Sequence, residues 1–121
     1  MASSAQRIFK TQGFNQAAQA ASISDAELHG VARQLVQGLG DDLGGNEWKK
    51  RLDQNRKRSI VLNKVGRYWF FVFLFAKSDR DNIDGRELAA FRKLASDFGN
   101  CASADIDRLV ELKELVEVCN D

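Results

Sequence analysis

Proline is absent from this chain, and cysteine and histidine are almost absent. Without proline no proline-rich linker can form. Cys101 and Cys119 stand without a CxxC pair or a nearby histidine, so the sequence predicts neither a disulfide scaffold nor a structural metal site. The longest apolar run, from Tyr68 to Ala76, is about half of the roughly 20 residues that a membrane-spanning helix needs. Residues 1–6 have no apolar signal-peptide core, so we expect a cytoplasmic protein with no membrane partner.

Familiar enzyme motifs are missing as well. The sequence contains no GxSxG, Walker A or GxGxxG motif, which argues against the enzymes that carry them. We interpret the one histidine, His29, as a helix surface or boundary residue rather than a catalyst, because it lies between apolar helical positions. The stretch 79–82 lacks the glycine and the terminal glutamate of an EF-hand loop. The sequence therefore predicts no cofactor.

The size and apolar content of the chain favour a folded domain. Of the 121 residues, 44% are hydrophobic, which is enough to bury a core and excludes wholesale disorder. We expect a single domain over residues 1–121, in which residues 1–6 form a flexible N-terminal extension.

Apolar spacing and capping residues predict the order of the elements. Ser24 with Glu27, and Asp84 with Glu87, are predicted capping boxes at helix starts. The expected helices cover 14–21, 24–39, 84–98 and a segment from 103, and the expected strands cover 7–10, 48–52, 57–64, 68–75 and 114–119. Tight turns are expected at 44–45 and 65–67. The predicted fold class is α+β, a small antiparallel sheet with two N-terminal helices and a C-terminal helix.

The near-neutral total charge hides two opposed patches. Eighteen Lys and Arg against 17 Asp and Glu give +1, which by itself offers no reason to expect a nucleic-acid partner. Residues 49–67, however, hold eight basic side chains and one acidic side chain, which gives +7, whereas residues 101–121 hold six acids and two bases, which gives −4. The eight basic residues are Lys49, Lys50, Arg51, Arg56, Lys57, Arg58, Lys64 and Arg67.

Strand geometry predicts how part of this charge is arranged. Successive side chains alternate between the faces of a strand, so Lys49 and Arg51 share one face and Arg58 can join them if the register allows. Lys77 and Arg80 follow the apolar strand and are expected at the rim of that face.

The basic segment alone leaves three interpretations open. It can be a solvated sheet face whose long side chains pack over tryptophan, a surface that binds nucleic acid, or a surface that binds an acidic protein. A cluster of cations repels itself until an anion neutralises it, and nucleic acid is the most abundant large anion in a cell.

Four segments, taken in order, resemble the RelE-like toxins of bacterial type II toxin–antitoxin systems, within the RelE/ParE superfamily. They are LGGNEWKKRL, RSIVLNKVGRYWFFVFLFAKSDRDNI, ELAAFRKLA and ELVEV. The resemblance extends from about Ile8 to Val118 and is greatest to the HigB-type or phage-related branch. It implies a small toxin that enters the ribosomal A site and cleaves mRNA, with a cognate antitoxin of the helix-turn-helix type as its partner.

The resemblance also implies a reaction and its residues. A ribose 2′-OH attacks the adjacent phosphate without a metal, which requires a proton acceptor, a proton donor and cations that stabilise the transition state. Arg51 and Arg58 match positions expected to clamp the phosphate, and Lys49 or Lys77 to assist proton transfer. The implied catalytic set is Lys49, Arg51, Arg58, Lys77 and Arg80. The other basic residues of the segment, which are expected to bind RNA, are Lys50, Arg56, Lys57, Lys64 and Arg67.

Three departures from the family pattern favour an alternative. The loop before Arg58 is several residues shorter and lacks glycine, Ser78 stands where some ribonuclease members carry arginine, and residues 83–85 include no tyrosine. The alternative is a non-cleaving or degenerate binding module on the same fold, which acts through an antitoxin or on another target such as gyrase. A free-standing RNA-binding regulator is a third hypothesis.

Overall fold

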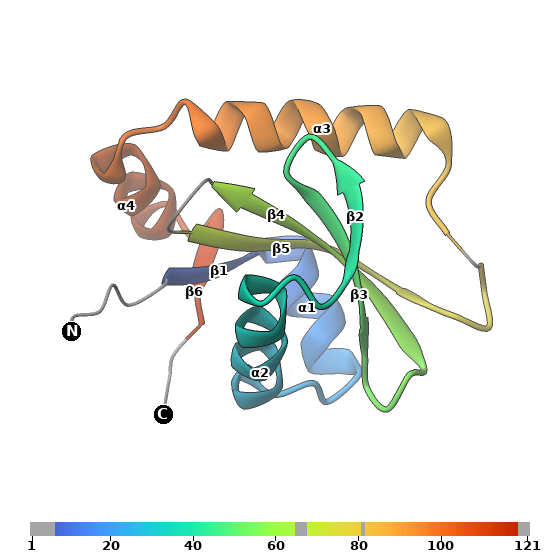
Figure 1. Cartoon of the computed structure of the whole chain (residues 1–121). Coiled ribbons are helices and arrows are strands. Elements are labelled where there is room, and N and C mark those ends of the chain that lie inside the picture. Colours follow the sequence, from blue (N-terminus) through green and yellow to red (C-terminus); the bar gives the residue numbers. More distant parts are fainter. Residues whose placement is uncertain (1–6, 65–67, 81, 119–121) are drawn as a thin grey trace.

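A computed structural model describes residues 7–64, 68–80 and 82–118 of the chain. In this part of the chain one sheet lies between two helical layers: α1 and α2 lie on one side and α3 crosses the other (Figure 1). The predicted turn at 65–67, the expected extension at 1–6 and Cys119 lie outside the described residues. The elements are β1 (Arg7–Thr11), α1 (Gln12–Ala20), α2 (Asp25–Val36), β2 (Asp41–Gly44), β3 (Glu47–Leu52), β4 (Lys57–Lys64), β5 (Tyr68–Ala76), α3 (Gly85–Gly99), α4 (Ser103–Glu111) and β6 (Leu115–Glu117).

The sheet is mixed, with the strand order β2-β3-β4-β5-β1-β6. The expectation of an antiparallel sheet is wrong at β1, which pairs parallel with β5 and antiparallel with β6. Both partners of β1 are distant in sequence, so no hairpin turn marks these pairings. Arg7 on β1 reinforces the second one, because its guanidinium donates two hydrogen bonds to the Glu117 carboxylate, each 3.0 Å long.

The helix arrangement also differs from the prediction. Two helices, α3 and α4, lie between β5 and β6, in agreement with the predicted helix starts at 84 and 103, whereas the predicted fold class contained a single C-terminal helix. Among the described residues, no helix combines the length and the apolar character needed to cross a membrane.

The alternation of the central strands divides the core into two clusters. On β5, Trp69 and Phe71 pack with α1 and α2, whereas Phe70 packs on the opposite face, where its ring stacks on that of Phe98 of α3 at 4.2 Å between centroids. This confirms that the aromatic run is a central strand covered on both faces. The sheet therefore has a helical layer on each side.

Two predicted capping boxes mark helix starts, and one of them is only half formed. The Asp84 carboxylate accepts from the Glu87 N–H and the Glu87 carboxylate accepts from the Asp84 N–H, so the predicted capping box of α3 is confirmed. At α2 the box is half formed: Ser24 accepts from the Glu27 N–H, but the Glu27 carboxylate instead accepts from the N–H of Asp53 at 2.6 Å. That hydrogen bond ties α2 to the turn between β3 and β4.

Candidate functional site

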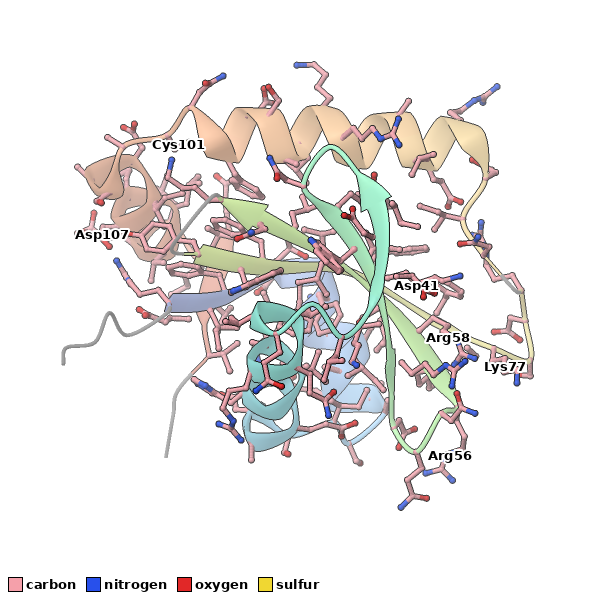
Figure 2. The ribbon with its side chains drawn as sticks, in the orientation of Figure 1. Asp41, Arg56, Arg58, Lys77, Cys101 and Asp107 are labelled. Carbon is pink, nitrogen blue, oxygen red and sulfur yellow. The ribbon has the colours of Figure 1, made fainter. Side chains whose placement is uncertain are left out.

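The β3–β4 hairpin and the loop after β5 project together from one end of the sheet (Figure 1). Antiparallel pairing of β4 with both β3 and β5 brings the end of β3, the start of β4 and the end of β5 to this same end. Arg56, Arg58 and Lys77 lie there, with Asp41 nearby, whereas Cys101 and Asp107 mark the opposite end (Figure 2). The topology thus gathers most of the predicted cations at one end of the molecule.

A hollow of about 230 Å³ lies between β2, β3 and β4, and we call it the cationic hollow. Arg51 faces Arg58 across the β3–β4 pair, and Asp41 faces Lys49 across the β2–β3 pair. Cross-strand partners point to the same face of a sheet, so these four side chains converge. The Lys49 Nζ lies 3.8 Å from the Asp41 Oδ2. The lining residues are Gly40, Asp41, Lys49, Lys50, Arg51 and Arg58.

The two arginines of the cationic hollow are held differently. Arg58 is 8% exposed, and its Nη1 donates to the carbonyl oxygens of Asn55 at 3.0 Å and Lys57 at 3.2 Å. Arg51 is exposed, and its guanidinium makes no hydrogen bond or ion pair with the described residues. Arg58 is therefore a fixed cation at the base of the hollow, and Arg51 is an available one at its mouth.

The short loop before Arg58 forms a left-handed turn without glycine. Asp53, Gln54 and Asn55 all have positive φ, at 54°, 53° and 72°. Such a run strains the backbone and persists only where neighbouring contacts hold it. Two contacts do so: the Glu27 carboxylate accepts from the Asp53 N–H, and the Asn55 carbonyl accepts from Arg58.

Arg80, predicted as catalytic, is placed by an ion pair on the face that carries Arg58. Its guanidinium donates to both carboxylate oxygens of Glu87, at the first turn of α3, and lies 5.6 Å from the centroid of the Phe75 ring. Phe75 is the cross-strand partner of Arg58. These hydrogen bonds, which Arg80 donates and Glu87 accepts, raise the pKa of Arg80 and lower the pKa of Glu87. Arg80 is therefore a cation whose charge is already balanced.

Lys77 lies in a different hollow from the other predicted catalytic residues. This hairpin–loop hollow has a volume of about 690 Å³ and is lined by Ala21, Asp53, Asn55, Arg56, Lys57, Ala76, Lys77 and Ser78. The backbone N–H of Lys77 donates to the Arg56 carbonyl at 2.9 Å, which joins the loop to the hairpin. The structure thus separates Lys77 from the group formed by Lys49, Arg51 and Arg58.

The remaining predicted RNA-binding residues are dispersed. Lys50 is one of the lining residues of the cationic hollow, but its side chain points to the face opposite Lys49 and Arg51, where its Nζ donates to the Leu39 carbonyl at 2.6 Å. Lys64 lies at the far end of β4, where its Nζ donates to the carbonyl oxygens of Phe98 at 3.4 Å and Gly99 at 2.8 Å, at the end of α3. Arg67 lies outside the described residues.

Sequence reasoning missed two carboxylates on or beside β2, because it missed that strand. Asp41 is on that strand, and Glu47 follows the β2–β3 turn. Gly45 and Asn46 both have positive φ, at 61° and 64°. A Gly-Asn pair is a known signal of a two-residue hairpin turn, so it could have revealed β2. Within the described residues, no group of three or more His, Cys, Asp or Glu side chains is placed to hold a metal ion.

Comparison with known proteins identifies the family of the chain. A family model described as the RelE toxin of the RelE / RelB toxin–antitoxin system matches residues 6–118. Searches among curated proteins and among solved structures gave no match. The match spans every described helix and strand, including those that carry the cationic hollow. The chain therefore belongs to the RelE toxin family, the toxin component of a toxin–antitoxin system.

Proposed function

We propose that this chain arrests translation as a ribosome-dependent mRNA endonuclease, through metal-independent attack of a ribose 2′-OH on the adjacent phosphate. The cationic hollow is the observation that carries the proposal. It places three cations, Lys49, Arg51 and Arg58, beside a single carboxylate, Asp41, on one face of paired strands. A phosphodiester brings negative charge, and its transition state brings more.

The two arginines suit the phosphate. A guanidinium is a planar fork that contacts two phosphate oxygens at once, and it stays protonated throughout the reaction. Arg58 is already oriented by two carbonyl oxygens, so little reorganisation accompanies the increase of charge in the transition state. Arg51 has no competing partner among the described residues and closes over the phosphate when the RNA arrives.

Asp41 and Lys49 suit the two proton transfers. As the bond from the 2′-oxygen to phosphorus forms, the Asp41 carboxylate takes the 2′-OH proton. As the bond from phosphorus to the 5′-oxygen breaks, the Lys49 ammonium gives a proton to the leaving oxygen. The products are a 2′,3′-cyclic phosphate and a 5′-OH. The Asp41 Oδ2 and the Lys49 Nζ lie 3.8 Å apart, so both groups can reach the same phosphodiester.

Expression in bacterial cells tests the proposal. Growth arrest with codon-phased cuts in mRNA, mapped by primer extension, is the expected result for the natural chain. The double variant R51A/R58A should lose these cuts, since one electrostatic contact to a transition state contributes roughly 10²–10³ in rate. R108A is the matched control, because Arg108 lies on α4 at the other end of the molecule. A folded R51A/R58A variant that still cuts at the same sites refutes the assignment.

One observation favours the non-cleaving alternative. The Glu87 carboxylate balances the charge of Arg80, and Ser78 stands in the loop where some ribonuclease members carry arginine, so this loop offers fewer free cations to the reaction. Such a module would act through its antitoxin or on another target such as gyrase. Growth arrest with intact mRNA identifies this alternative.

A further inference from the structure

The charged side chains of the first two residues of β4 lie on opposite faces of the sheet. Arg58 pairs with Phe75 on the face covered by α3, whereas Lys57 pairs with Ala76 on the face covered by α1 and α2. The cationic hollow and the hairpin–loop hollow therefore lie on either side of one hairpin. The reaction proposed above uses only the first, which leaves the larger hollow and its lysines without a role.

The lining of the hairpin–loop hollow combines free cations with a small apolar surface. Lys57 and Lys77 form no ion pair with the described part of the chain, whereas Arg56 is paired with Asp53 at 3.0 Å. Ala21 and Ala76 contribute short apolar side chains that leave room above them. The volume of about 690 Å³ is within the roughly 300–1,000 Å³ of small-molecule sites. A ligand with an anionic group and a flat, partly apolar body fits this lining.

The covered part of the sheet limits the path of a strand that occupies the cationic hollow. Toward the middle of the sheet, α3 covers the same face, and its Arg92 donates to the Leu43 carbonyl at 2.5 Å, which closes the β2–β3 turn against the helix. The open direction leads past the tip of the β3–β4 hairpin (Figure 1). Arg56 and Lys77 lie on that side, in the hairpin tip and the neighbouring loop (Figure 2).

We propose that the hairpin–loop hollow binds a nucleotide of the same RNA strand that lies beyond the three nucleotides around the cleaved bond, so that the RNA passes around the β3–β4 hairpin. Lys57 and Lys77 neutralise its phosphate, and its ribose and base lie against Ala21 and Ala76. None of the described residues that line the hollow is aromatic, so the base is held without stacking. This inference rests on the proposed function, since it assumes RNA in the cationic hollow.

Binding of RNA oligonucleotides to the purified chain tests the proposal. The probes are a trinucleotide and a dodecamer, both 2′-O-methylated to prevent cleavage, with affinity measured by fluorescence anisotropy over a range of salt concentrations. Each phosphate contact to single-stranded nucleic acid contributes about 0.7 to the slope of log K against log salt. K57A/K77A should lower that slope for the dodecamer by about 0.7, because both lysines neutralise one phosphate, and leave the trinucleotide unaffected. R51A/R58A should weaken binding of both probes.

Matched controls and opposing outcomes keep the inference open to refutation. K93A removes an exposed lysine from α3 and should not change the slope, and thermal unfolding verifies that each variant is folded. An unchanged dodecamer slope in K57A/K77A, or no RNA affinity in the natural chain, overturns the proposal. Loss of binding to a polyglutamate peptide without a change in the RNA slope also overturns it and assigns the hollow to an acidic protein.

The two proposals can fail separately. If the dodecamer slope falls as expected but cells show intact mRNA, cleavage is refuted while the RNA site stands. If mRNA is cut with the same efficiency by K57A/K77A and the slope does not change, the flanking site is refuted while cleavage stands.

Discussion

Glu47 allows a sharp prediction about stability and pH, because its carboxyl group is fully buried and poorly compensated. Its exposed fraction is 0%, and neither carboxylate oxygen has a hydrogen-bond partner among the described residues. The nearest cation is Arg92, whose Nε lies 3.9 Å from Oε1. Burial raises the pKa of Glu47 from 4.5 to about 7, although the charge of Arg92 opposes this.

The sign follows from proton binding. Between pH 4.5 and about 7 the folded chain keeps a proton on Glu47 that the unfolded chain loses, so the free energy of unfolding falls as pH rises through this window. At about 1.36 kcal/mol for each unit of pKa, the loss reaches about 3 kcal/mol above pH 7. Glutamine carries no charge at any pH, so E47Q avoids this loss. We expect E47Q to match the natural chain near pH 4 and to exceed it by up to about 3 kcal/mol at pH 8.

Urea unfolding at pH 4 and pH 8, followed by tryptophan fluorescence, measures this difference. E114Q is the matched control: Glu114 is exposed, so this variant should match the stability of the natural chain at both pH values. A gain in E47Q that is the same at both pH values contradicts the reasoning, because it would arise from packing rather than from charge. A loss at pH 8 contradicts it more strongly, because it would mean that Arg92 stabilises a charged carboxylate.

Three further predictions concern stability away from the proposed RNA contacts. D84A removes the N-cap of α3 and should lower the free energy of unfolding by about 1 kcal/mol in urea titrations. K64M removes the cation that binds the last carbonyls of α3, so we expect a loss of about 0.5 kcal/mol and no change in the salt slope of RNA binding. In G45A an alanine must adopt the positive φ of Gly45, and its Cβ lies within 3.1 Å of the Arg92 side chain. We therefore expect the free energy of unfolding to fall by about 1–2 kcal/mol and proteolysis of the β2–β3 hairpin to become faster.

The elements were predictable where local signals exist. The aromatic run of β5, the complete capping box of α3 and the spacing of α2 each report on a few neighbouring residues, and each was predicted at nearly its observed bounds. The parallel pairing of β1 with β5 was not predictable in this way, because it joins segments with no turn between them. β2 was not predicted because the strand is only four residues long.

The candidate site was predictable as a set of cations but not as a geometry. Alternation predicted that Lys49 and Arg51 share a face, and the register places Arg58 with them. Lys77 lies in another hollow because β5 ends at Ala76, so strand alternation does not set the direction of the Lys77 side chain. The ion pair of Arg80 with Glu87 depends on how α3 folds back, which no strand pattern contains.

The place of β1 in the sheet affects how the chain folds during synthesis. Arg7 and Glu117, which join β1 to β6, are 110 positions apart in sequence. β1 is the first strand to leave the ribosome, but it cannot pair until β5 has been synthesised. Its second partner, β6, follows only at the end of the described chain. Such long-range pairings slow folding, because a large loop must close before any contact forms. A nascent chain of this topology thus completes its sheet only after nearly all of it has been translated.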